Sequence, residues 1–148
     1  MPGVQVAVIG SGAEHEGRAE EVGRLLAERG CTVVTGGLGS VMAAAARGAK
    51  SAGGVTIGVL PSESRRDANE WLDHTVVTGV GHARNLAVVA SGDAVIAVGG
   101  RWGTLAEIAF ANVLGRPVVI LEPGWELDGV PRAASPGEAV DLALAAIR

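Results

Sequence analysis

The stretch DAVIAVGGRWGTLAEIAFANVLGRPVVIL, Asp93 to Leu121, carries the features that decide the fold of this chain. An apolar run from Ala94 to Val98 leads into a glycine-rich turn, a segment of helical length from Thr104 to Leu114, and a second apolar run from Pro117 to Leu121. Short apolar runs that alternate with helices are typical of parallel strands buried on both faces. The stretch therefore predicts a strand, a helix and a second parallel strand.

The same alternation continues through the whole chain. It predicts an α/β fold with one domain, residues 1–148, built on a single Rossmann-like, doubly wound parallel sheet with helices on both faces. The expected strands are Val4 to Ile9, Thr32 to Thr35, Thr56 to Leu60, His74 to Val77, Ala94 to Val98 and Pro117 to Leu121. The expected helices are Glu16 to Arg29, Ser40 to Ala52, His82 to Ser91, Thr104 to Leu114 and Pro136 to Ile147.

Composition excludes several classes of protein. The net charge is −4 and no run of Lys and Arg follows the chain, so we expect no nucleic acid partner. Glycines and charged residues interrupt every apolar segment before the length of about 20 residues needed to cross a bilayer, so we expect no membrane partner. The single cysteine, Cys31, and the absence of a signal-peptide pattern favour a cytoplasmic protein. The three histidines are scattered, which implies neither a metal nor a cofactor.

Three glycine-rich turns follow predicted strands and precede predicted helices. Such turns offer free backbone N–H groups and the positive end of a helix dipole, which together bind anions. Because the carboxyl ends of parallel strands meet at one sheet edge, we expect a phosphorylated small-molecule ligand there. The alternative is that short turns need glycine for their backbone conformation whatever they bind. The candidate binding residues are Gly10, Ser11, Gly36, Gly37, Gly39, Gly99, Gly100, Gly103 and Thr104.

Two familiar nucleotide motifs are missing. His15 stands where a dinucleotide-binding fingerprint has its third glycine, and Thr35 and Gly36 stand where an acidic residue would bind the ribose of NAD. No G-x-x-x-x-G-K-[ST] pattern occurs either. A dehydrogenase of the NAD type and a P-loop ATPase are therefore disfavoured.

Glu107 is an acid among apolar residues, and the sequence allows two explanations for it. In the pattern Thr104-x-x-Glu107, Thr104 caps the helix and Glu107 reaches back to the N–H of Thr104, as in a capping box. Alternatively, a carboxylate one turn into a helix beside a phosphate-binding turn can act as a base or stabilise a developing positive charge. Spacing alone does not separate the two.

Arg84 is the second candidate catalytic residue. It falls in the first turn of the helix from His82 to Ser91, where a cation opposes the helix dipole and an anionic partner would offset that cost. Glu107, a ligand phosphate or both fit that role, and the alternative is a solvated arginine. The polar segment Pro61 to Asp73 fits either a lid or a solvated loop.

The motifs TGGLGSVM, GHARN and VGGRWGTLAEIA resemble those of the Lonely Guy (LOG) family, long labelled lysine decarboxylases. The wider group includes DNA-processing protein A and the molybdenum cofactor carrier proteins. The resemblance implies that Arg84 and Glu107 are catalytic, that the turn from Gly99 to Thr104 binds a nucleotide phosphate, and that a nucleoside 5′-monophosphate is cleaved to free base and ribose 5-phosphate.

This chain departs from the cytokinin-activating members of the family at three positions. Asn85 replaces a lysine, Val98 replaces a proline, and Ala106 replaces the first of two glutamates. Two functions therefore compete. The first is a phosphoribohydrolase-like enzyme, and the second is a non-catalytic binding or carrier protein for a nucleotide or the molybdenum cofactor, in which Glu107 is only a cap.

The two helices of the site also predict assembly. The helix from Thr104 is apolar nearly all round, and the helix from His82 carries Leu86, Val88 and Val89, so one sheet face cannot cover both. Large exposed apolar patches are uncommon on soluble monomers. We therefore expect a homodimer that buries Phe110, and the family resemblance implies the same.

Overall fold

The computed structural model describes residues 3–147 and contains one sheet of seven strands, in the order β4-β3-β2-β1-β5-β6-β7. Every strand pair is parallel. The strands are β1 (Gln5–Ser11), β2 (Thr32–Thr35), β3 (Thr56–Leu60), β4 (His74–Val77), β5 (Ala94–Gly99), β6 (Val118–Leu121) and β7 (Arg132–Ala133). The predicted parallel sheet is confirmed.

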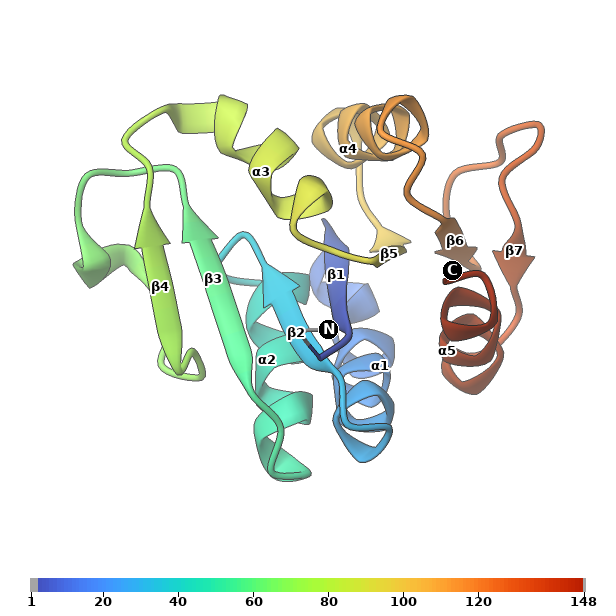
Figure 1. Ribbon diagram of the computed structural model, residues 1–148, viewed down its shortest axis with the longest axis horizontal. Coiled ribbons are helices and arrows are strands. Elements are labelled where there is room, and N and C mark those ends of the chain that lie inside the picture. Colours follow the sequence, from blue (N-terminus) through green and yellow to red (C-terminus); the bar gives the residue numbers. More distant parts are fainter. Residues whose placement is uncertain (1–2, 148) are drawn as a thin grey trace.

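Helices cover both faces of the sheet, as a doubly wound fold requires (Figure 1). They are α1 (Glu16–Glu28), α2 (Val41–Ser51), α3 (Arg84–Ala90), α4 (Trp102–Val113) and α5 (Pro136–Ala145). On one face α1, α2 and α5 pack against side chains such as Val6 and Val33. On the other face α3 and α4 pack against Ala7 and Ile9, which are buried because alternate residues of a strand point to opposite faces.

The order of the strands creates a switch point between β1 and β5. From β1 the chain adds β2, β3 and β4 on one side, and then returns to add β5, β6 and β7 on the other side. The loops that leave β1 and β5 consequently run to opposite faces of the sheet, which leaves a crevice outside the carboxyl ends of these strands. This crevice is where ligands bind in open parallel sheets.

One strand was not predicted, and the ends of several elements differ from the sequence prediction. β7 is two residues long, Arg132–Ala133, and no apolar run marks it. Helix α4 begins at Trp102 and not at Thr104, with Arg101 as the residue before the first turn. The shift matters for the site because it moves Thr104 into the helix.

Some of the apolar residues on α3 and α4 are exposed, as predicted, and others are buried. Val88 and Val89 are buried against the sheet, so its face covers this part of α3. Leu86, Phe110 and Val113 do face solvent, with exposed fractions of 41%, 42% and 82%. We call these three side chains the outer apolar face. Within residues 3–147, no helix has both the length and the apolar character needed to cross a bilayer.

Candidate functional site

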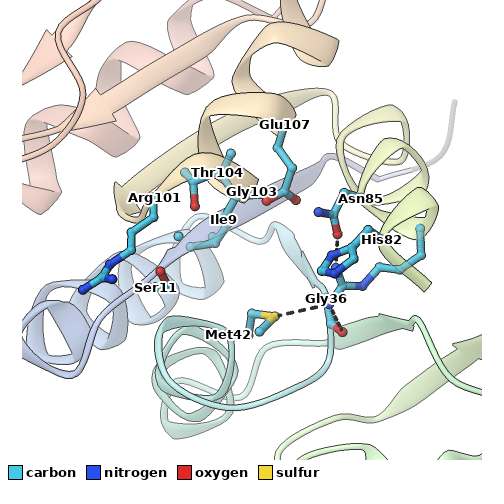
Figure 2. A pocket seen from close by; sticks show the side chains of 13 residues that line it. Ile9, Ser11, Gly36, Met42, His82, Asn85, Arg101, Gly103, Thr104 and Glu107 are labelled. Atoms are coloured by element: carbon cyan, nitrogen blue, oxygen red, sulfur yellow. Dashed lines mark hydrogen bonds between the residues drawn. The ribbon is translucent and has the colours of Figure 1, made fainter.

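An open cavity of about 270 Å³ lies at the carboxyl ends of the strands, at the β1–β5 switch point. Side chains and backbone from five segments line it: the end of β1, the turn after β2, the start of α2, the start of α3 with the turn before it, and the start of α4 (Figure 2). The lining residues are Val8, Ile9, Gly10, Ser11, Gly36, Met42, His82, Arg84, Asn85, Arg101, Gly103, Thr104 and Glu107.

All three predicted glycine turns reach this sheet edge, but not all their residues line the cavity. Gly10, Ser11, Gly36, Gly103 and Thr104 line it. The other four predicted binding residues lie in the same turns without lining it: Gly37, Gly39, Gly99 and Gly100. Five of the nine candidate binding residues therefore line the cavity, and the other four lie close to them in the chain.

Backbone packing explains two of the glycines. A Cβ atom at Gly10 would overlap the carbonyl oxygen of Val98 on the neighbouring strand. Gly100 has a φ of +98°, and a Cβ there would overlap the side chain of Thr104. Both therefore have a structural reason to be glycine that is independent of any ligand.

Gly36 is different because its missing side chain makes room for the site itself. A Cβ at this position would lie 2.6 Å from Nη2 of Arg84 and 2.7 Å from Sδ of Met42. The backbone of the second turn therefore forms one wall of the cavity. An alanine at this position would push against the guanidinium group.

Hydrogen bonds hold the turns to one another. The N–H of Gly12 donates to Oγ of Ser40 (3.0 Å), which joins the first turn to the second. Ser40 has a φ of +58°, a conformation that residues other than glycine rarely adopt. The segment Pro61 to Asp73 is bound to the second turn as well, because Asn69 donates its N–H to the carbonyl of Gly37 and its Nδ2 to the carbonyl of Leu38.

Arg84 is buried, with 8% of its surface exposed, so the alternative of a solvated arginine is wrong. Its Nε donates to the carbonyl of Val59 (2.9 Å), its Nη2 to the carbonyl of Gly36 (3.3 Å), and its Nη1 to Oδ1 of Asn85. An anion was the partner expected for Arg84, but carbonyl and amide oxygens accept these hydrogen bonds. They fix the guanidinium at the wall of the cavity, and burial lowers the pKa of Arg84.

Glu107 does not form a capping box, the first of the two explanations that the sequence allowed for it. Because α4 begins at Trp102, Thr104 is the third residue of the helix and cannot cap its start. Among the described residues, no hydrogen bond or ion pair reaches the carboxylate of Glu107, which lines the cavity and is 9% exposed. The acid is therefore buried at the cavity without a capping role.

The surroundings of Glu107 change its ionisation. Burial raises the pKa of Glu107 from 4.5 to about 7, and the positive charge of Arg84 offsets part of this rise. A carboxyl group with a pKa near 7 can both accept and donate a proton at neutral pH, which is the property of a general acid or base. Strongly shifted pKa values in a cavity are characteristic of functional sites.

The start of α4 offers a place for an anion. The first intrahelical bond of α4 runs from the N–H of Leu105 to the carbonyl of Arg101 (3.0 Å). The N–H groups before Leu105 have no upstream carbonyl within the helix, as at every helix N-terminus. Two of these residues, Gly103 and Thr104, line the cavity, so the helix dipole and free donors are directed at it.

Six lining residues were not predicted as site residues: Val8, Ile9, Met42, His82, Asn85 and Arg101. Asn85 entered the sequence analysis only as a departure from a family motif, although it is 8% exposed and holds Arg84. The sequence could have indicated Asn85 and Arg101, because each is adjacent to a predicted site residue. No metal-binding cluster of three or more His, Cys, Asp or Glu side chains occurs within residues 3–147.

Comparison with known proteins identifies relatives along most of the chain. The SLOG cluster4 family matches residues 3–142. An uncharacterised protein from Archaeoglobus fulgidus is 42% identical over 144 residues, which is 95% of each chain. A cytokinin riboside 5′-monophosphate phosphoribohydrolase from Mycobacterium tuberculosis is 34% identical over 121 residues, or 76% of this chain. The matched region spans only 65% of the length of that relative.

Solved structures include a close match. The molybdenum cofactor binding protein from Rippkaea orientalis is 34% identical, with a TM-score of 0.93, and the alignment covers 100% of this chain and 99% of that one. This chain is therefore similar in sequence to a named phosphoribohydrolase and in structure to a named cofactor binding protein.

Proposed function

Because the chain belongs to the SLOG cluster4 family, and because its cavity holds a buried acid beside a fixed arginine, we propose that it binds a nucleoside 5′-monophosphate and hydrolyses the N-glycosidic bond. The products are a free base and ribose 5-phosphate. The observation that carries this proposal is Glu107, whose carboxylate borders the cavity, has a pKa raised to about 7, and has no capping role. A similarity to phosphoribohydrolases supports it.

The proposed roles follow from position in the cavity. The phosphate binds the N–H groups at the start of α4, near Gly103 and Thr104, with Gly10 and Ser11 opposite. The ribose then lies next to the carboxylate of Glu107. Cleavage builds positive charge on the ribose ring, so the carboxylate of Glu107 stabilises that charge and takes the proton of the attacking water.

Arg84 acts mainly as a fixed positive charge in this proposal. Three of its N–H groups are held by Val59, Gly36 and Asn85, so its guanidinium stays in place when a ligand binds. Its charge favours the ionised form of Glu107, which is the form that can accept a proton.

A second candidate function is a non-catalytic carrier of the molybdenum cofactor or of a nucleotide. The likeness to the molybdenum cofactor binding protein, over the whole of both chains, favours it. The same anion-binding helix start would hold the cofactor's phosphate. In this role a buried carboxylate at the cavity performs no chemistry, which is why we rank the carrier second.

An assay of base release separates the two functions. The protein is incubated with each common nucleoside 5′-monophosphate, and free base is measured by liquid chromatography. Turnover that is lost in Glu107→Gln and kept in the exposed control Glu70→Gln is the expected result. Ligand-induced thermal stabilisation without release of base from any substrate would instead favour the carrier.

We also propose that the outer apolar face is the centre of a homodimer. Leu86 comes from α3, and Phe110 and Val113 come from α4, so the three residues expose apolar surface on the two helices that also border the cavity. A stable dimer needs about 1,200 Å² of buried surface or more in total, which requires the neighbouring parts of both helices as well.

A further inference from the structure

The proposed hydrolysis needs two groups that exchange protons. When the bond between C1′ and the base nitrogen breaks, the electron pair leaves with the base, which must gain a proton to become a stable product. Water adds its oxygen to C1′ and must lose a proton. Glu107 accounts for the second transfer and leaves the first without a donor.

The cavity offers few candidates for that donor. Its ionisable side chains are His82, Arg84, Arg101 and Glu107. The two arginines stay protonated in proteins and do not take part in proton transfer. Histidine, in contrast, exchanges protons near neutral pH and is the commonest general acid in enzymes. His82 is therefore the remaining candidate for the first transfer.

The position of His82 suits a leaving base. It lies in the short 3-10 turn Gly81–Ala83 that leads into α3, and its side chain is exposed at the cavity. In Figure 2 it lies on the α3 side of the cavity, whereas Arg101 and Ser11 lie on the opposite side. A nucleotide with its phosphate at the start of α4 would extend its base toward His82, with the ribose between them.

The ring of His82 is also available for this role. Among residues 3–147, no hydrogen bond or ion pair engages its nitrogens, in contrast to His15, which contacts Glu14 and Arg18. Both ring nitrogens are therefore free to contact a ligand.

We infer that His82 is the general acid that protonates the departing base. In this step the C1′–N bond breaks, the base takes the bonding electron pair and the proton of the His82 imidazolium, and water forms the new C1′–O bond as Glu107 takes its proton. Transfer of the proton from Glu107 through solvent to His82 restores the starting state. The inference rests on the proposed hydrolysis and adds to it a second catalytic residue.

The dependence on the leaving group tests this role. Two substrates are compared, AMP and p-nitrophenyl β-ribofuranoside 5-phosphate, whose p-nitrophenolate leaves without protonation. In His82→Gln we expect kcat for AMP to fall by at least about 100-fold, the usual contribution of general acid catalysis. Turnover of the nitrophenyl substrate stays close to that of the wild type. His74→Gln, an exposed histidine on β4, is the matched control and keeps both activities.

Each other outcome has a defined meaning. Equal losses on the two substrates would assign His82 a structural role, and unchanged kcat on AMP would remove it from the reaction, so either overturns the inference while the proposed hydrolysis stands. If AMP is not cleaved, the nucleoside 5′-monophosphate that is cleaved takes its place, and a wild-type protein that cleaves none of them overturns both. Circular dichroism and thermal unfolding of His82→Gln verify that the variant is folded.

Discussion

The burial of the Glu107 carboxyl group leads to a prediction about the stability of the protein that does not depend on any substrate. Its pKa is raised by burial to about 7 in the folded protein, against 4.5 for an ordinary glutamate. Between these values the folded state keeps a proton that the unfolded state has lost, so the free energy of unfolding falls as the pH rises from about 4.5 to about 7. At about 1.4 kcal/mol per pH unit, the loss is about 3 kcal/mol.

Glu107→Gln removes this ionisation while keeping the size of the side chain. Urea unfolding of the wild type and the variant between pH 4.5 and 8 measures the difference between their free energies of unfolding. Relative to the wild type, the free energy of unfolding of Glu107→Gln is expected to rise by up to about 3 kcal/mol from pH 4.5 to about pH 7, and then to stay constant. The control Glu70→Gln changes little, since Glu70 is exposed. Parallel curves for the wild type and Glu107→Gln would refute the argument that the carboxylate is desolvated.

Three other predictions test the site and the assembly. Gly36→Ala is expected to reduce kcat by up to about 100-fold, because its methyl group would lie 2.6 Å from Nη2 of Arg84. The control Gly39→Ala, with nothing within 4 Å of the new methyl group, is expected to keep the wild-type kcat. Equal kinetics for the two variants would contradict this prediction. Arg84→Ala is expected to weaken AMP binding and lower turnover together, and an unchanged dissociation constant in calorimetry would exclude a role in binding. Phe110→Asp is expected to halve the mass measured by light scattering, whereas Leu142→Asp on α5 is not; a wild type with the mass of one chain would contradict the dimer.

Most of the fold could be predicted because its strands carry a strong local signal. Runs such as Ala94 to Val98 are apolar and β-branched, and they become the fully buried β5 of the sheet. β7 could not be predicted because Arg132 and Ala133 form a strand only through pairing with Ile120 and Leu121. A two-residue strand of this kind depends on tertiary contacts and leaves no periodic pattern.

The start of α4 shows how a correct pattern can mislead. Thr104-x-x-Glu107 satisfies the capping-box pattern, yet the helix is already formed two residues earlier, at Trp102. Contacts before Thr104 accompany this earlier start: Nε1 of Trp125 donates to the carbonyl of Arg101, and the ring of Trp125 lies 5.5 Å from that of Trp102. Trp125 is distant in sequence, so no local pattern reveals its effect on the helix.

The site was predictable in outline for a geometric reason. Turns after parallel strands share one sheet edge, so Gly10, Gly36 and Gly103 were expected together and do line one cavity. Which atoms fill the space between them depends on side-chain packing across the sheet. The bonds from Arg84 to Val59 and Gly36 join residues 25 and 48 positions apart, and the sequence gives no indication of them.

Helix α4 presents Glu107 to the cavity and, three residues later, Phe110 to solvent. If the proposed site and the proposed dimer both hold, ligand binding and subunit contact share this helix, which offers a direct route for coupling the two equilibria. If assembly changes the affinity of the cavity by some factor, the ligand must change the association constant of the subunits by the same factor. The substrate concentration would then regulate the oligomeric state, and dilution of the protein would alter its apparent affinity for substrate.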